Sequence, residues 1–485
     1  MSLLKQTAQQ SFLYVCFQVI GLILSFLSFP IMTRIFSVSE YGDLALVNAI
    51  LAILIPFAKC GMPTSVIKQY ALNATETDKT ILYSSSLGGI SIYFTIVFVV
   101  YSIIALFTKN YFVLNIKQLL LVIGIALLSR SMQSLFSGFY RSEEKVLTLN
   151  VVGIIFRVGS IIVGITTCLL IIKGLYGYLL GTVVFEGVMT LWMIGMFYWK
   201  NVLDVKMISL SEIKTLFAFG FPLICFEASS LVNDYADRFL IKYFLDSTQL
   251  GIYSVGYNLS LYVQGFITAP IWMTVFPIYT KLWETQGMEK TASYLATILK
   301  AYLCIAILVL CGTLLVSKEF VILAATEKYY PAAQVVPFVT GSILLYGTYH
   351  ITGAGFYLLN KTKLIAMYMV ICAMLHIVLN VYLIPKYQIM GAAYSTVISY
   401  IVLTFLFTKK ANSLLRIRWP IKDAIVYMTF GVITALALWH VHLSNIVATL
   451  LIKFFACLTL YMGLVFLYDR NLRVKAVSLI RNRAR

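Results

Sequence analysis

The sequence predicts an all-α, polytopic membrane protein with about fourteen transmembrane helices. Hydrophobic residues occupy 61% of the 485 positions and charged residues only 12%, and the mean hydropathy is +0.91. An average soluble domain carries roughly 25% charged residues, so this class of protein is excluded. The apolar runs are long enough to cross about 30 Å of hydrocarbon as helices, and they lack the alternation of barrel strands.

The first six predicted spans are apolar runs separated by short polar or charged turns. The stretch from Ser11 to Thr33 is too long for a signal peptide and has no small-residue cleavage site, so it is the first span. The six ranges are 11–33, 43–58, 81–107, 118–140, 146–172 and 175–199.

Eight further spans follow, and the first of them contains several charged residues. Their ranges are 215–240, 251–276, 292–316, 332–359, 364–384, 390–408, 423–440 and 444–468. The total is even, so both ends of the chain are expected on the same side of the membrane.

Internal repetition divides the spans into groups of six, six and two. Arg34 and Arg238, 204 residues apart, each follow or end an apolar span and precede a glycine-containing segment. The motif GFY occurs at 138–140 and again at 355–357, an offset of 217. We therefore expect two six-helix lobes, 1–200 and 201–411, in a parallel arrangement around a central cavity, with 412–485 as two additional helices and a basic cytoplasmic tail.

The net charge of +18 is distributed unevenly between the two sides. Loops and tails on the side of the termini carry 25 lysines and arginines, counting Lys300 at the start of its span, and the opposite loops carry 8. This bias predicts that both termini are cytoplasmic. The charge therefore reflects topology and contact with anionic lipid, and no nucleic-acid partner is expected.

Cysteine and histidine patterns predict neither a metal nor another cofactor. The eight cysteines are scattered without a CxxC pair, and the four histidines are equally dispersed. No carboxylate forms a metal-ligand constellation with them.

Basic residues inside or near the spans are the strongest functional signal. An ionisable group at bilayer depth costs roughly 2.5–3.5 kcal/mol, so it faces protein, water or a ligand and indicates transport. Arg130 and Arg157 lie well inside their spans, whereas Arg34, Lys59 and Arg238 lie near span ends. We interpret these five as a cationic binding site.

Four carboxylates provide candidates for ion coupling or charge pairing: Glu186, Glu227, Asp234 and Asp237. Structural alternatives remain open for each cation. Arg238 pairs with Asp234 one turn earlier in one interpretation, and Glu186 neutralises either Arg130 or Arg157. Lys59, Arg34 and Lys453 have the alternative of extending to the lipid headgroups.

Four segments in order resemble the polysaccharide biosynthesis flippases of the multidrug, oligosaccharidyl-lipid and polysaccharide exporter superfamily. They are PIMTRIFSVSEYGDLAL after the first span, the proline and the DR pair of span 215–240, FPIYTKL at 276–282, and residues 359–400. The resemblance covers about residues 5–410. It implies a flippase in the bacterial cytoplasmic membrane that moves an undecaprenyl-diphosphate oligosaccharide, such as an O-antigen unit, to the outer leaflet.

Such a substrate suits a cationic cavity, because arginine binds phosphate through its planar fork and stays charged. Expected partners are this lipid-linked oligosaccharide, membrane lipids and a polysaccharide polymerase with its chain-length machinery. A monomer suffices.

Three alternative functions remain. A multidrug cation antiporter of the same superfamily needs carboxylates that the first five spans lack in their middle. A lipid II flippase would also need a cationic cavity, because its substrate is a lipid-linked diphosphate. A membrane glycosyltransferase or polymerase needs large loops or catalytic carboxylates, so we expect no enzyme.

Overall fold

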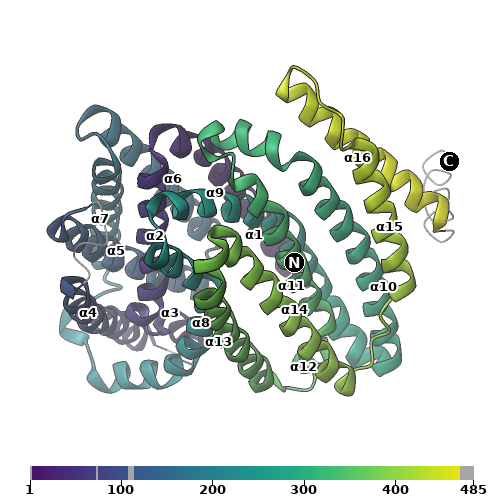
Figure 1. Cartoon of the computed structure of the whole chain (residues 1–485). Coiled ribbons are helices and arrows are strands. Elements are labelled where there is room, and N and C mark those ends of the chain that lie inside the picture. Colours follow the sequence, from purple (N-terminus) through teal and green to yellow (C-terminus); the bar gives the residue numbers. More distant parts are fainter. Residues whose placement is uncertain (1–2, 73–74, 108–113, 470–485) are drawn as a thin grey trace, which may run out of the picture. The chain divides into compact units, whose positions relative to one another are not determined.

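The structure is a computed structural model, and it describes residues 3–72, 75–107 and 114–469. Side chains are described from residue 16 onward, except at 225, 226, 228–230, 269 and 362. Every element within these ranges is helical (Figure 1). The elements are α1 (Leu3–Ile35), α2 (Val38–Lys59), α3 (Met62–Tyr70), α4 (Glu76–Phe107), α5 (Ile116–Ser142), α6 (Val146–Leu170), α7 (Leu175–Trp199), η1 (Val205–Met207), α8 (Leu210–Phe244), α9 (Ser247–Val263), η2 (Gln264–Thr268), α10 (Ala269–Ala325), η3 (Glu327–Tyr329), α11 (Ala332–Thr352), α12 (Ala354–Leu358), α13 (Thr362–Tyr387), α14 (Ile389–Leu414), α15 (Ile421–Leu438) and α16 (Ile446–Tyr468).

The helices confirm the predicted fold class. Within the described ranges, eleven segments are long and apolar enough to cross a membrane. One of them, Ser247–Ala325, contains two predicted spans. The helix α8 contains the predicted span 215–240, and α11 together with the short α12 covers the predicted span 332–359. The chain is thus a multi-pass membrane protein whose helices agree with fourteen spans.

One predicted loop is helical in the structure. Residues 277–291 were expected to connect two spans, but they belong to α10. The helix changes direction at Gly287, whose φ of 78° lies in the left-handed region that favours glycine. Two spans therefore follow one another with a kink in place of an open loop.

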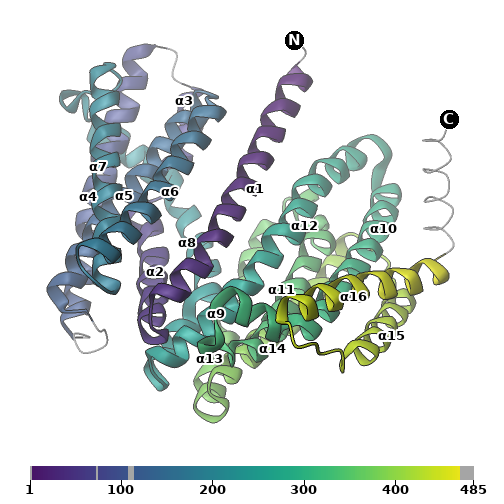
Figure 2. The same ribbon diagram turned by 90° about the horizontal axis from the view of Figure 1, so that it is seen from above.

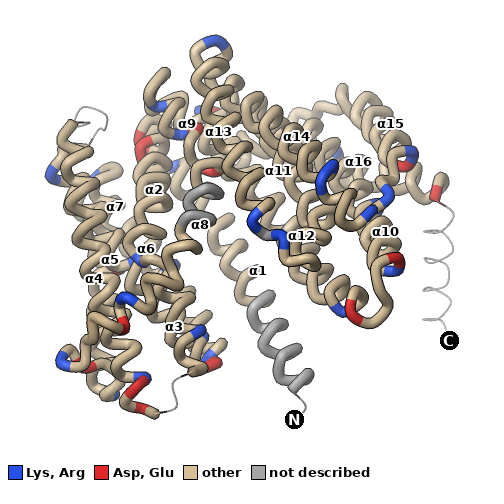
Figure 3. Tube along the Cα trace, turned by 90° about the horizontal axis from the view of Figure 1, so that it is seen from below, with Lys and Arg blue, Asp and Glu red and all other residues tan. Residues whose placement is uncertain are grey.

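The chain forms two compact units, residues 1–251 and 252–485. The predicted boundaries at 200 and 411 rest on sequence repetition and remain predictions. In both units, charged residues gather mainly near the helix ends, and most of the helical length between them is uncharged (Figure 3).

The first unit is organised around α5, which packs against α2, α3, α4, α6 and α7. One of its core clusters contains several aromatic rings. The rings of Tyr83 and Phe139 stack with centroids 4.0 Å apart, and Phe136 stacks on Phe197 at 5.2 Å. Offset aromatic pairs add about 0.5–1.5 kcal/mol each to the burial of their surface, so this core fixes the relative rotation of its helices.

The second unit is organised around α10, which packs against α11, α15 and α16. The last two helices form a hairpin beside α10 (Figure 2). Along this contact, the hydroxyl of Tyr461 donates to the carbonyl oxygen of Cys304 at 3.0 Å. The sulfur atoms of Cys311 and Cys457 lie 3.8 Å apart. The hairpin is thus joined to α10 over most of its length.

Candidate functional site

Arg130 on α5 and Glu186 on α7 form an ion pair between two packed helices. The Nε atom of Arg130 donates to both carboxylate oxygens, at 3.2 and 3.1 Å, and Nη2 donates to Oε1 at 3.0 Å. The Glu186 side chain is 3% exposed, but that of Arg130 is 30% exposed. Of the two partners left open for Glu186, the structure selects Arg130, whose side chain stays partly exposed.

Lys59 ends α2 and pairs with Glu227 on α8. Its Nζ atom lies 2.8 Å from Oε1 of Glu227. The chain turns directly afterwards at Gly61, whose φ is 65°. A Cβ atom on Gly61 would lie 2.5 Å from the Cα atom of Gly220, so the backbones of this turn and α8 touch. This close approach brings Lys59 to a carboxylate about two turns further along α8, instead of to the headgroups.

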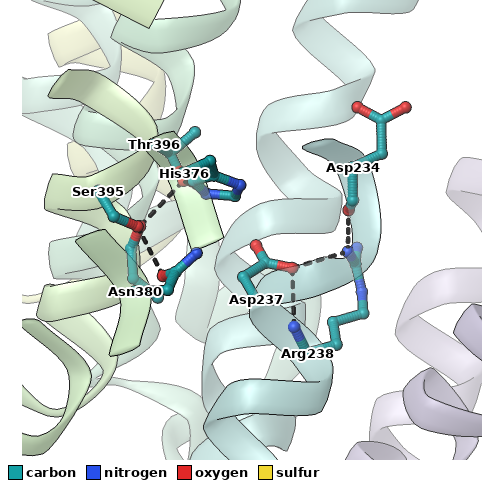
Figure 4. A network of polar contacts seen from close by, with 8 residues as sticks. Asp234, Asp237, Arg238, His376, Asn380, Ser395 and Thr396 are labelled. Atoms are coloured by element: carbon teal, nitrogen blue, oxygen red, sulfur yellow. Dashed lines mark hydrogen bonds and ion pairs between the residues drawn. The ribbon is translucent and has the colours of Figure 1, made fainter. Parts of the chain in front are cut away.

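Arg238 on α8 contacts two residues of its own helix. Its Nη1 atom donates to the backbone carbonyl oxygen of Asp234 at 2.5 Å and lies 3.4 Å from Oδ1 of Asp237. The carboxylate of Asp234 points away from the guanidinium group (Figure 4). Of the interpretations left open for Arg238, the structure does not select a pair with the Asp234 carboxylate, because the arginine folds back along its own helix and lies beside the carboxylate of Asp237.

The two other predicted cations lie beside backbone of α1. Arg34 is exposed at the end of this helix, and its Nη1 atom donates to the carbonyl oxygen of Pro30 at 2.9 Å. Arg157 on α6 is exposed, and a Cβ atom on Gly21 would lie 3.6 Å from its Nη1 atom. The guanidinium group of Arg157 therefore lies within van der Waals distance of α1 at Gly21.

A third interhelical pair was missed by the sequence interpretation. Asp43 on α2 is fully buried, with its Oδ1 atom 3.2 Å from Nζ of Lys242 on α8. Ser247 donates to the same oxygen at 2.5 Å and also contacts Lys242. The two charges are 199 residues apart, and both lie at span ends, where charged residues are common. The available signal was the position of Asp43 beside the glycine of a repeated segment.

That repeated segment is visible as a reciprocal contact between the first turns of α2 and α9. A Cβ atom on Gly42 would collide with the carbonyl group of Ser247, and one on Gly251 would collide with that of Val38. Val38 and Ser247 are each the first residue of their helix. Each helix thus presents a glycine to the first carbonyl group of the other.

The second unit contains a polar cluster between α13 and α14 (Figure 4). Ser395 donates to Oδ1 of Asn380 at 2.6 Å, and Nε2 of His376 lies 3.3 Å from the hydroxyl of Thr396. All four side chains are buried. Within the described ranges, no group of three His, Cys, Asp or Glu residues has an arrangement that could hold a metal ion.

In the first unit, several cations form ion pairs with carboxylates of the protein itself. Three of the predicted cations contact a predicted carboxylate: Arg130, Lys59 and Arg238. Arginine and lysine bind phosphate through charge-assisted hydrogen bonds that a carboxylate can also accept. The arrangement is therefore capable of exchanging an internal carboxylate for an anionic ligand wherever the cation is accessible.

Two curated proteins are similar in sequence to part of the chain. An uncharacterized membrane protein of Methanocaldococcus jannaschii is 24% identical over 270 residues, which are 54% of this chain and 51% of that protein. The "Probable low-salt glycan biosynthesis flippase Agl15" of Haloferax volcanii is 23% identical over 216 residues, 44% of this chain and 46% of that protein. The chain spans about half the length of the curated relatives it matches.

Solved structures share the fold over nearly the whole chain. The lipid II flippase MurJ in an inward closed conformation superposes with a TM-score of 0.78 at 16% identity, covering 96% of this chain and 99% of MurJ. An inward-facing multidrug resistance MATE family transporter of the MOP superfamily gives 0.61 at 13% identity, covering 81% and 98%. At these identities, the likeness establishes the fold alone.

A family model extends the sequence evidence over most of the first unit and beyond it. The model described as polysaccharide biosynthesis protein matches residues 7–283, more than half of the chain. This range contains every residue of the predicted site. The chain belongs to the polysaccharide biosynthesis protein family.

Proposed function

We propose that the protein is a flippase that moves an undecaprenyl-diphosphate-linked oligosaccharide from the cytoplasmic to the outer leaflet by alternating access. The observation that carries this proposal is the pairing of Arg130 with Glu186. It places an arginine within a membrane span, with 30% of its side chain exposed and a carboxylate already bound. Such a cation is costly in hydrocarbon unless a ligand or water uses it.

Counter-ion exchange is the mechanism that fits this geometry. A diphosphate brings about two negative charges and enough oxygens to accept the fork of an arginine. When it binds Arg130, Glu186 loses its partner and takes up a proton or another cation. The carboxylate thus neutralises the site between transport cycles and supplies a route for ion coupling. The proposed site has four further cations: Arg157, Arg34, Lys59 and Arg238. The last two already contact a carboxylate of the protein.

The membrane potential is a sufficient energy source for this direction. With both termini in the cytoplasm, as proposed from the distribution of lysine and arginine, the anion leaves a negative compartment. One charge gains about 2.3 kcal/mol per 100 mV, and two charges gain about twice that. The sugars in this proposal form an O-antigen or similar repeat unit, and a polymerase receives the product at the outer leaflet.

The test is flipping of a fluorescent undecaprenyl-diphosphate oligosaccharide in proteoliposomes under an imposed potential. The native chain should flip it, and the potential should accelerate the reaction. The double variant Arg130→Gln, Glu186→Gln keeps the pair neutral and should reduce the rate by about tenfold or more, which corresponds to about 1.4 kcal/mol of lost interaction. Its matched control is the double variant Lys453→Met, Glu319→Met, which removes a pair from the second unit and should flip normally.

Four outcomes would contradict the proposal. Equal rates for both double variants and the native chain would make Arg130 structural. Transport of cationic dyes without transport of the saccharide lipid would indicate an antiporter, and preference for lipid II would change the substrate. Transfer of sugar by the purified protein would indicate an enzyme.

A further inference from the structure

The second unit contains a cavity of about 450 Å³ between α10, α11, α14 and the hairpin of α15 and α16. Its volume lies within the roughly 300–1,000 Å³ typical of ligand pockets. The lining residues come from the end of α10, the start of α11 and the start of α14, together with the turn after α15. Consecutive spans alternate in direction, so these helix ends lie at one membrane face, which is the outer face in the proposed orientation.

The wall of the cavity is rich in aromatic rings. Tyr330, Phe338, Tyr394 and Trp439 all line it, and the rings of Phe338 and Tyr394 meet edge to face at 5.3 Å. Tyr330, Phe338 and Trp439 are 42%, 40% and 53% exposed. Tyrosine and tryptophan favour the level of the lipid headgroups, where one end of the side chain is apolar and the other is polar.

The charges at the cavity are positive. Lys453 is 3% exposed and is neutralised behind the wall by Glu319, 2.7 Å away. Lys318 is exposed, lines the cavity and, within the described part of the chain, makes no ion pair. Its Nζ atom lies 6.0 Å from the ring centroid of Tyr330. Gln334 adds an exposed amide. The cavity thus combines one uncompensated ammonium group with neutral hydrogen-bonding groups and aromatic faces.

We propose that this cavity binds the headgroup of an anionic lipid in the outer leaflet. Lys318 would meet the phosphate, Gln334 and the tyrosine hydroxyls would meet headgroup hydroxyls, and the aromatic rings would contact the upper part of the chains. On the cytoplasmic side of membranes, basic pockets between transmembrane helices bind phosphorylated headgroups through the same kinds of contact. A cationic ligand is disfavoured, because the nearest carboxylate, Glu319, is already paired with Lys453.

The same chemistry comes from two sources: a bulk phospholipid with a glycerol headgroup, or a polyprenyl diphosphate. Either source satisfies the proposal, because both present phosphate next to an apolar chain. The site differs from the cations of the first unit, and its occupancy requires no translocation. Binding can therefore succeed or fail independently of the flippase function.

The experiment measures lipid binding to the delipidated, purified full chain by native mass spectrometry. The probes are phosphatidylglycerol, phosphatidylcholine with the same acyl chains, and undecaprenyl diphosphate. Lys318→Gln removes the charge, and Gln334→Trp fills the cavity from an exposed position on α11. The matched control is Lys328→Gln, which removes an exposed lysine from η3, shortly after the end of α10, without lining the cavity.

The native chain should bind at least one anionic probe more tightly than phosphatidylcholine. Lys318→Gln should weaken that binding about tenfold through the loss of one charge-assisted contact. Gln334→Trp should weaken it by a similar factor because the indole occupies the space of the headgroup, whereas Lys328→Gln should have no effect. A loss for phosphatidylglycerol identifies the bulk lipid as occupant, and a loss confined to undecaprenyl diphosphate identifies the lipid carrier. Equal binding of phosphatidylcholine, or no effect of either cavity variant, would overturn the proposal.

Discussion

The ion pairs Arg130–Glu186 in the first unit and Lys453–Glu319 in the second have the same charges in different surroundings. Both join two helices, at 3.0 and 2.7 Å. In the first pair, the cation is 30% exposed and only the carboxylate is buried. In the second, the lysine is 3% and the glutamate 8% exposed. An accessible cation can exchange its partner for a ligand, but a cation enclosed with its partner serves packing.

A second contact in the hairpin supports this distinction. Lys300 on α10 lies 3.0 Å from Asp423 at the start of α15 and 2.7 Å from Asp469 just after α16. Together with Lys453 and Glu319, it fixes the hairpin to α10 at both ends. The buried charges between the hairpin and α10 therefore stabilise the packing of these helices. A charge within the membrane therefore indicates transport only where its side chain is also exposed.

The largest expected effect is on stability, from the variant Lys453→Met. It leaves Glu319 buried without its partner, which costs about 3–5 kcal/mol of unfolding free energy. Thermal unfolding in detergent should show a much lower Tm than that of the native chain. The double variant Lys453→Met, Glu319→Met should recover most of the loss, because it leaves no unpaired charge. If the single variant unfolds at the native Tm, the pair of Lys453 and Glu319 does not stabilise the fold.

Hydropathy and charge bias were sufficient to predict the helices, because the bilayer forces each span to satisfy its backbone internally. The candidates for the partner of Glu186 could be limited to two arginines, because few positively charged residues lie within the spans. The kink at Gly287 was not predicted, since amphipathic helix and loop have similar composition near the membrane surface.

Pairings that depend on helix rotation could not be predicted. Lys453 was expected to extend to the headgroups, but the packing of α16 on α10 turns it toward Glu319. Asp43 and Lys242 are brought together by the contact of α2 with α8, between segments far apart in the sequence. Sequence spacing predicts neighbours on one helix, such as Asp234 and Arg238, but not the rotamer that selects among them.

The next largest effect is expected at the pair of Arg130 and Glu186, in which only the carboxylate is fully buried. Arg130→Gln strands a buried carboxylate and should cost about 3 kcal/mol of unfolding free energy. Glu186→Gln leaves a partly exposed arginine and should cost less than about 1 kcal/mol. The same Glu186→Gln variant should bind a short-chain polyprenyl diphosphate about tenfold more tightly, because no carboxylate competes. Thermal unfolding and a binding titration measure the two quantities. Equal destabilisation by both variants, with unchanged affinity, would place this pair in the structural class of Lys453 and Glu319.

The smallest effect is expected at Lys59 and Glu227, where both partners are accessible. Their side chains are 20% and 42% exposed. Pairs of this kind contribute about 0–1 kcal/mol and weaken with salt, because water competes with each partner. Lys59→Gln and Glu227→Gln should therefore leave the Tm nearly unchanged. Since Lys59 belongs to the proposed cationic site, Lys59→Gln should still slow flipping more than Glu227→Gln does. If instead Glu227→Gln is the slower variant, the exchangeable carboxylate matters more than the cation, and the coupling ion, not the diphosphate, is the ligand of this pair.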